Sequence, residues 1–345
     1  MSAPPISEQK EEALIAVLKN LDHKRSATGV AQVALPYPNG WFVACLSHEL
    51  LTGQVMRVPF MGQELVFYRT ASGLARAIDP YCPHLGAHLG HGGKVIGEDL
   101  VCPFHGLMFN PQGHCIRTGN GQKPPAASLT QRYFREVDGA IFVWRHEDNL
   151  PPYWEVPELD CAGFSQGRYE TFQLQGLSQD MTENSAAPFH FAYLHGLQEV
   201  TTNHQENGHE MVYTMQAKVF GQVVTMRMTC YGIGYAVGEA SFERLGLVAR
   251  TQALGTQTIP LGWTFRMIDT IRVESIKTLR QPLRRITYAL PLFFIHRWFV
   301  KTVKEDFAVW SNRRFLSAPK LVKDESNMAI YRRWTAQFYP QREKS

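Results

Sequence analysis

Four residues in the first half of the sequence have the types and the spacing of a metal centre. They are Cys82 and His84 in the segment CPHLGAHLG and, after seventeen intervening residues, Cys102 and His105 in the segment CPFHG. Two thiolates and two imidazoles suit zinc or an iron–sulfur centre. In Rieske centres, two histidines replace two cysteines on one iron of a [2Fe–2S] cluster. Because each segment supplies one Cys and one His, two loops could clamp such a cluster from both sides.

A structural zinc site with the same four ligands is the alternative. Zinc ligands usually pair Cys with Cys and His with His, at the spacings of fingers and ribbons. Two mixed pairs fit those patterns poorly, so the spacing favours the Rieske cluster. Four glycines nearby would let the backbone approach the cluster sulfides. They are Gly86, Gly90, Gly92 and Gly106.

A second candidate site lies in the segment ENSAAPFHFAYLHG, residues 183–196, which contains His190 and His195. Residues five positions apart lie about 140° apart around a helix, so the two imidazoles converge only if the helix is distorted or ends nearby. Pro188 and Gly196 fit such an irregularity. Two histidines and one carboxylate form the facial triad of non-heme Fe(II) oxygenases, which leaves positions open for O₂. Two histidines in an apolar helix are more often core residues, but a Rieske centre in the same chain favours ligands.

The helices and strands expected around these residues are those of an α+β protein. We expect a helix over residues 8–22 and then short strands, broken by Gly and Pro, from residue 41 to residue 146. In the second half, alternating apolar residues predict strands of one antiparallel sheet over residues 167–176, 209–220, 221–232, 245–256 and 261–275. A helical end is expected from residue 283 to about residue 338. The expected domains are an N-terminal helix and lead-in (1–36), an all-β Rieske domain (37–147), a linker (148–165) and a catalytic domain with C-terminal helices (166–345).

Composition narrows the class of protein. The chain has 345 residues, 44% of them hydrophobic and 19% charged, so it can bury a sizeable core. A net charge of only +4 implies neither nucleic acid nor an anionic membrane as a partner. The six cysteines are too sparse for a disulfide framework, and the N-terminus does not resemble a signal peptide. Both features predict a cytoplasmic protein.

Residues 286–300 form the most hydrophobic stretch of the chain. They include Pro291, His296 and Arg297 and fall short of the roughly 20 apolar residues of a spanning helix. We therefore expect no transmembrane segment. A buried helix, or a helix packed against a partner chain, is favoured, and peripheral contact with a membrane stays open.

The two cluster segments, CPHLGAHLG and LVCPFHGLMFNPQGHC, resemble the Rieske domain of the Rieske non-heme iron oxygenases. The resemblance extends over nearly the whole chain. It implies a helix-grip catalytic domain, built from an antiparallel sheet and helices, that holds a mononuclear Fe(II). His190 and His195 match the iron histidines of that family, and Asn184 matches a polar residue near the iron. The third ligand that the resemblance implies is Asp306 in VKEDFAVWSNRRF, with Glu305 as its competitor.

One position departs from the family pattern. Ala187 stands where the family has an acidic residue, three positions before the first iron histidine. In relatives, that carboxylate bonds to an iron histidine and to a Rieske histidine of the neighbouring subunit, and it connects the two centres for electron transfer. Glu183 and Asp180 are the candidate bridges here. A water molecule or a differently organised electron delivery are the alternatives.

The resemblance also implies an activity and its partners. It implies the oxygenase component of a monooxygenase, which receives electrons from NAD(P)H through a separate flavin and iron–sulfur reductase and uses O₂ to hydroxylate or desaturate its substrate. It further implies a head-to-tail homotrimer. The chain contains no GxGxxG sequence, so it should not bind the nicotinamide itself.

The substrate class rests on two features. The motif spacing and the segment PPYWEVPEL look most like the branch with the 3-ketosteroid 9α-hydroxylase oxygenases and sterol 7-desaturases. Methionine-rich strands favour a large, neutral, apolar substrate such as a steroid or a lipid. One alternative is a tailoring oxygenase for polyketides or other natural products. An alternative from another class is a Rieske electron-transfer protein without a catalytic iron.

Overall fold

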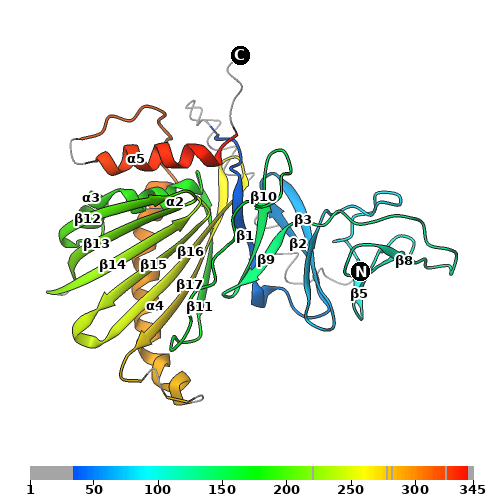
Figure 1. Ribbon diagram of the computed structural model, residues 1–345, viewed down its shortest axis with the longest axis horizontal. Coiled ribbons are helices and arrows are strands. Elements are labelled where there is room, and N and C mark those ends of the chain that lie inside the picture. The colour runs from blue at the N-terminus through cyan, green and yellow to red at the C-terminus, as the bar shows by residue number, and fades with distance from the viewer. Residues whose placement is uncertain (1–33, 220, 277–278, 281–282, 323–324, 341–345) are drawn as a thin grey trace.

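The computed structural model describes residues 34–340, except for residue 220 and residues 277–278, 281–282 and 323–324. The helix expected over residues 8–22 lies outside the described residues. Small sheets from the first half of the chain form one end of the molecule, and a large sheet with helices forms the other (Figure 1). The predicted α+β fold, with an all-β N-terminal part, is confirmed.

Three small antiparallel sheets form the N-terminal part. Their strand orders are β1–β10–β9 (Gly40–Leu46, Ala140–Arg145, Phe134–Val137), β2–β3–β4 (Val55–Phe60, Gln63–Arg69, Ala75–Ile78) and β5–β6–β7–β8 (Lys94–Ile96, Asp99–Val101, Met108–Phe109, Cys115–Arg117). The loop after β4 and the loop between β6 and β7 carry the candidate cluster ligands. Both loops rest on a core of buried apolar residues that includes Leu89, Leu100, Leu107 and Phe109.

A seven-stranded antiparallel sheet forms the second part. Its order is β11–β17–β16–β15–β14–β13–β12, with bounds Arg168–Gln175, Gly262–Val273, Leu247–Ile259, Tyr235–Phe242, Gln222–Tyr231, Glu210–Val219 and Gln198–Asn207. Every neighbouring pair is antiparallel. Strands β12 and β15 were not among the strands predicted from the sequence.

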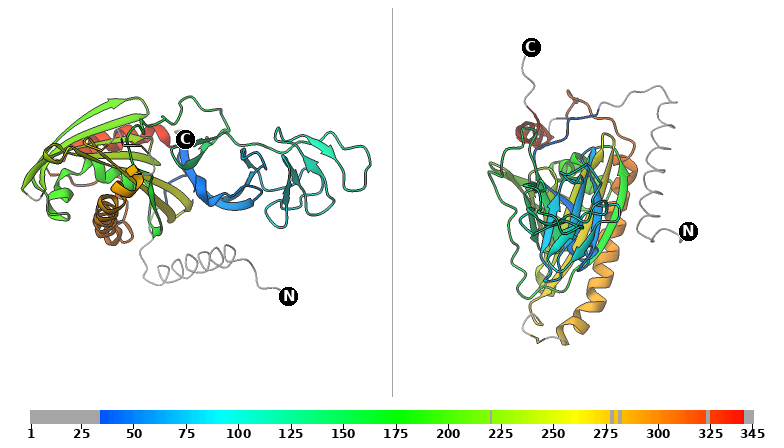
Figure 2. Two further views of the ribbon diagram at one scale, coloured as in Figure 1. Left: turned by 90° about the horizontal axis from the view of Figure 1, so that it is seen from below. Right: turned by 90° about the vertical axis from the view of Figure 1, so that its right-hand side faces the viewer.

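In the described part of the chain, two α-helices follow the sheet. The long helix α4 (Leu283–Trp310) lies along one face of the sheet (Figure 2), where Tyr288 and Leu292 pack against Ala249 of β16 and Ile271 of β17. The shorter helix α5 (Ser326–Thr335) continues into a 3₁₀ turn, η4 (Ala336–Phe338). The helical end predicted from residue 283 is therefore interrupted, since the described residues between α4 and α5 are not helical.

Strand β16 joins the two parts of the molecule. The Thr256 hydroxyl donates to the Val43 carbonyl of β1 (2.6 Å), and the Met61 amide donates to the Gln257 carbonyl (3.0 Å). One apolar core cluster contains side chains from both parts, among them Phe42 and Tyr331. The N-terminal sheets and the seven-stranded sheet are thus joined by direct hydrogen bonds and a shared apolar core. The domain boundaries themselves stay predictions.

Among the described residues, no helix is both long enough and apolar enough to cross a membrane. The hydrophobic stretch 286–300 lies within α4.

Candidate iron centres

The candidate cluster ligands lie on two loops of the same shape. In the first, the Cys82 amide donates to the carbonyl five residues on (2.8 Å), and the Gly86 amide donates back to the Cys82 carbonyl (2.9 Å). In the second, Cys102 and Gly106 make the same two bonds, at 2.8 and 3.2 Å. Both glycines have left-handed φ angles, +74° and +65°, which glycine adopts without strain. The repeated turn places a cysteine at the same point of each loop.

The four ligands divide into an inner and an outer pair. Cys82 and Cys102 are each only 2% exposed, whereas His84 and His105 are exposed, with ring centroids 4.9 Å apart. Burial raises the pKa of the Cys82 thiol to about 11, so a thiolate here needs a bound metal to stabilise it. Two buried sulfurs and two exposed imidazoles fit a [2Fe–2S] cluster whose histidine-bound iron lies at the surface.

The helix that carries the second site is broken at Ala187. It consists of α2 (Gln179–Glu183), the 3₁₀ turn η2 (Asn184–Ala186) and α3 (Pro188–Tyr193). Ala187 has φ −109° and ψ 80°, and Pro188 opens α3, a position where its missing N–H costs no helical hydrogen bond. His190 lies inside α3, and His195 lies just beyond its end. The distortion predicted from the five-residue spacing is present.

The break brings three donor groups together. One ligand atom each of His190, His195 and Asp306 lie within 4.8 Å of one another. Asp306 comes from the C-terminal turn of α4, and its side chain is 9% exposed. Its Oδ2 lies 3.4 Å from His195 Nε2. The Asn184 amide donates to the other oxygen of Asp306, Oδ1 (2.9 Å). Two imidazoles and one carboxylate fit a mononuclear Fe(II) that keeps open positions.

Each imidazole is fixed from behind through its Nδ1. His190 Nδ1 donates to the backbone carbonyl of Ala187 (2.5 Å), and His195 Nδ1 donates to Glu305 Oε2 (3.0 Å). In both rings, this bond leaves the lone pair of Nε2 free for a metal. Glu305 therefore lies behind His195, while Asp306 lies among the ligand atoms.

The electrostatics of the two histidines differ. Burial lowers the pKa of His190, against a smaller raising effect of the Ala187 carbonyl, so its ring is neutral near pH 7 and able to bind a metal. Burial also acts to lower the pKa of His195, but the hydrogen bonds to Asp306 and Glu305 outweigh it and raise the pKa. The two carboxylates that favour a proton there would also attract a metal cation.

The two candidate bridging residues are both buried in α2. Glu183 is 1% exposed. Its Oε1 accepts from Arg313 and from Arg332 (2.8 Å), and its Oε2 accepts from Gln179 (3.2 Å). Burial alone would raise the pKa of Glu183, but the two arginines lower it. Asp180 lies 3.5 Å from Arg313, and burial raises its pKa to about 7. An electron-transfer role of either residue stays a prediction.

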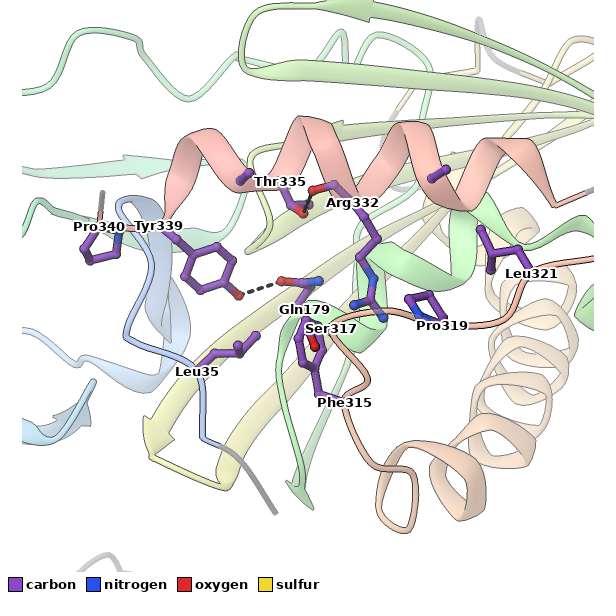
Figure 3. A pocket seen from close by; sticks show the side chains of 12 residues that line it. Leu35, Gln179, Phe315, Ser317, Pro319, Leu321, Arg332, Thr335, Tyr339 and Pro340 are labelled. Atoms are coloured by element: carbon purple, nitrogen blue, oxygen red, sulfur yellow. Dashed lines mark hydrogen bonds between the residues drawn. The ribbon is translucent and has the colours of Figure 1, made fainter. Parts of the chain in front are cut away.

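A pocket of about 600 Å³ adjoins the charged cluster that Glu183 and Asp180 form with Arg313 and Arg332. Figure 3 shows it between α5, the chain that follows α4, and Gln179 of α2, whose amide oxygen accepts from the Tyr339 hydroxyl (2.6 Å). Arg332 forms part of its wall, but none of the three candidate iron ligands does. We therefore do not assign this pocket to the substrate.

Sequence reasoning missed three residues of this site. Glu305 was considered only as a competing ligand, and Arg313 and Arg332 were not considered. The adjacent carboxylates Glu305 and Asp306 in the sequence could have indicated two roles, one as a metal ligand and one as the hydrogen-bond partner of a ligand histidine. The arginines lie 130 and 149 residues from Glu183, and no local pattern connects them.

Two family matches cover nearly all of the described chain. Residues 40–149 match the Rieske [2Fe-2S] domain, and residues 143–339 match the 3-ketosteroid 9alpha-hydroxylase C-terminal domain. The chain belongs to the Rieske oxygenases. It is an oxidoreductase of a family that carries a [2Fe–2S] cluster and a non-heme iron, as the sequence predicted.

Similar proteins include enzymes named for steroids. The cholesterol 7-desaturase nvd of Bombyx mori is 30% identical over 323 residues, covering 88% of this chain and 70% of its own. The cholesterol 7-desaturase of Caenorhabditis elegans is 30% identical over 355 residues, covering 93% and 81%. The oxygenase component of the 3-ketosteroid-9-alpha-monooxygenase of Mycobacterium tuberculosis is 25% identical over 347 residues, covering 91% and 86%.

Solved structures share the fold at lower identity. Apo dicamba monooxygenase superposes with a TM-score of 0.67 at 16% identity, covering 89% of this chain and 98% of its own. The QL mutant of NdmA from Pseudomonas putida CBB5, solved with caffeine, gives 0.66 at 17% identity, covering 86% and 89%.

Proposed function

We propose that this chain is the oxygenase component of a Rieske monooxygenase that hydroxylates or desaturates a largely apolar, steroid-like substrate with O₂. The observation that carries the proposal is the convergence of His190, His195 and Asp306 in a chain that also has the paired Cys/His loops. An electron carrier would need only the loops. The triad supplies the second iron site that oxygen chemistry requires.

Cys82 and Cys102 hold the inner iron of the cluster in this proposal, and His84 and His105 hold the outer one. The two exposed imidazoles form the surface through which electrons enter and leave. The electrons come from NAD(P)H by way of a separate flavin and iron–sulfur reductase. The named oxygenase component in Mycobacterium tuberculosis supports such a division of labour.

His190, His195 and Asp306 hold the mononuclear iron, which when bound supplies the site of O₂ activation next to the substrate. The protein groups around it fix the ligands. The Ala187 carbonyl holds the ring of His190, and Glu305 holds the ring of His195. Asn184 occupies one oxygen of Asp306 and so leaves the other for the metal. A carboxylate or carbonyl behind a ligand histidine fixes its tautomer and raises its basicity.

Electron transfer between copies of the chain is favoured by the shape of the molecule. The cluster loops lie beside β5 and β8 at one end of its longest axis, and α3 lies at the other (Figure 1). Because electron transfer weakens steeply with distance, the cluster of one copy should serve the iron of another. A head-to-tail homotrimer closes such contacts into a ring.

The substrate class rests on the steroid enzymes among the similar proteins and on the methionine-rich strands of the sheet. Hydroxylation and desaturation both begin with oxidation of a C–H bond, so the site supports either. Polyketides and other apolar natural products are the alternative substrates.

The variant His190→Ala tests the proposal. It should abolish O₂-dependent turnover of a steroid panel with a surrogate reductase, while the absorbance and paramagnetic signal of the cluster stay unchanged. The iron content should fall from about three to about two per chain, since only the mononuclear iron is lost. Glu158→Gln, on the exposed linker, is the matched control. Turnover that survives in His190→Ala would contradict the assignment of the triad.

A further inference from the structure

Helix α4 carries an exposed apolar stripe that the proposed function does not use. Five large side chains in its first twelve residues are between 38% and 70% exposed: Leu283, Ile286, Leu290, Phe293 and Phe294. Exposed apolar residues are ordinary when scattered, but a contiguous group usually marks a contact surface.

The five residues lie on one side of the helix. At about 100° per residue, they fall within an arc of roughly 100°. The opposite side already faces the sheet, where Tyr288, Leu292 and His296 are buried. This half of α4 therefore carries large, mostly apolar side chains on two faces, but the described residues cover only the face toward the sheet. Such a helix normally has a second apolar surface against it.

Beyond the apolar stripe, cationic side chains lie on the same side of α4. At about 100° per residue, Arg297, Lys301 and Lys304 fall on the arc of the apolar residues, and all three are exposed. The stretch from Leu283 to Lys304 contains no Asp or Glu. Arg168 of β11 adds a guanidinium 5.3 Å from the Phe293 ring. Although the net charge of the whole chain is small, this face of α4 is therefore locally cationic.

We propose that this face of α4 binds the surface of a lipid bilayer that contains anionic lipids. The apolar stripe enters the boundary between headgroups and acyl chains, and the cations that follow it contact lipid phosphates. Apolar residues with lysines and arginines on one helix are the combination found in interfacial helices. An isologous contact with a second copy would bring the same cations together, and the head-to-tail contact proposed above has to reach the iron site, whose Asp306 lies near the opposite end of this 28-residue helix. Binding would place the enzyme where apolar substrates partition.

The experiment uses the full chain, with its iron centres loaded, and sucrose-loaded vesicles. One set contains phosphatidylcholine alone, and the other contains phosphatidylcholine mixed with phosphatidylglycerol. We expect sedimentation with the mixed vesicles at least about tenfold stronger than with phosphatidylcholine, and weaker at high salt. The triple variant Ile286→Ser/Leu290→Ser/Phe294→Ser should lose at least about tenfold in binding. Leu51→Ser/Leu150→Ser changes two exposed leucines elsewhere and should bind like the wild type.

The charge variant Arg297→Glu/Lys301→Glu separates the two contributions, and it also serves if the triple variant fails to fold. It should lose the preference for anionic vesicles. Light scattering should give one oligomer mass for all variants. The proposal is overturned if the wild-type protein does not sediment with the mixed vesicles, or if the triple and charge variants bind as the wild type does. A change of oligomer mass with unaltered vesicle binding would instead identify the stripe as a contact between copies.

Discussion

The two histidines that we propose as iron ligands have hydrogen-bond partners of different charge. His190 donates to the neutral carbonyl of Ala187, and His195 donates to the carboxylate of Glu305. The negative charge therefore stands behind the second histidine, and the first has a neutral partner. With a side chain 34% exposed, Glu305 also connects the buried site to the surface. At position 187, the group that binds the histidine is the backbone carbonyl.

The substitution Glu305→Gln tests this asymmetry. The amide oxygen can still accept from His195, but the charge is lost, so the imidazole becomes a weaker donor to the metal. We expect the affinity of the mononuclear site for Fe(II) to fall by about tenfold. Titration of the iron-depleted site with Fe(II) or Co(II) measures it, and the cluster spectrum should not change.

The affinity of Glu305→Gln is compared with that of a control variant and with that of the wild type. Glu158→Gln removes an exposed carboxylate outside both candidate sites and should leave the affinity unaltered. An affinity in Glu305→Gln equal to that of the wild type would show that the carboxylate behind His195 has no influence on the metal.

At the scale of elements, α2 is held from behind by the C-terminal part of the chain. Arg313, just after α4, and Arg332 of α5 both donate to Glu183. These contacts link α2, the helix that precedes the proposed iron ligands, to both elements that follow the sheet. Asp180 belongs to the same charged cluster, but the nearby arginines do not offset its burial, which raises its pKa to about 7.

The stability of the protein should therefore depend on Asp180 in a defined pH window. Its pKa is raised in the folded state, so between about pH 4 and pH 7 the folded chain holds a proton that the unfolded chain has released. The free energy of unfolding then falls as the pH rises through this window, by at most ~1.4 kcal/mol per unit. Asp180→Asn removes this effect. Denaturant unfolding across the window should show the variant gaining stability relative to the wild type as the pH rises, and a constant difference would contradict the assignment.

Elements with strong local patterns could be predicted from the sequence, and others could not. Alternating apolar residues indicated β13, β14, β16 and β17. Strand β12 was missed because QEVTTNHQEN is polar throughout, and its pairing with β13 decides its structure. The choice between Glu305 and Asp306 was open because neighbouring residues differ by about 100° around a helix. Only the position of α4 against α3 decides which carboxylate faces the histidines.

At the scale of the whole molecule, the separation of the two centres decides how the enzyme can work. The N-terminal part is joined to β16 by backbone and side-chain bonds, so it cannot easily swing its cluster toward the iron of the same chain. One chain alone should therefore be inactive, even with both centres loaded.

Mixed oligomers test this expectation. Cys102→Ser removes the cluster and His190→Ala removes the iron, so each variant alone should be inactive. Co-expressed in equal amounts, they should regain activity, because some contacts pair an intact cluster with an intact iron of another copy. In a head-to-tail ring, roughly a quarter of the contacts meet this condition. Turnover by the purified mixture measures it, and full inactivity would indicate transfer within one chain.

Helix α3 has no buried side chain, although it carries one proposed iron ligand and leads into another. A six-residue helix is too short to be stable by itself, so its order depends on what its ends hold. We expect the metal to supply much of that order. In iron-depleted protein, amide hydrogens of residues 188–195 should exchange with deuterium much faster, while the sheet stays protected. The metal would then act as a folding cofactor for one turn and a half of helix, and the last step in maturation of this enzyme would be local folding around iron.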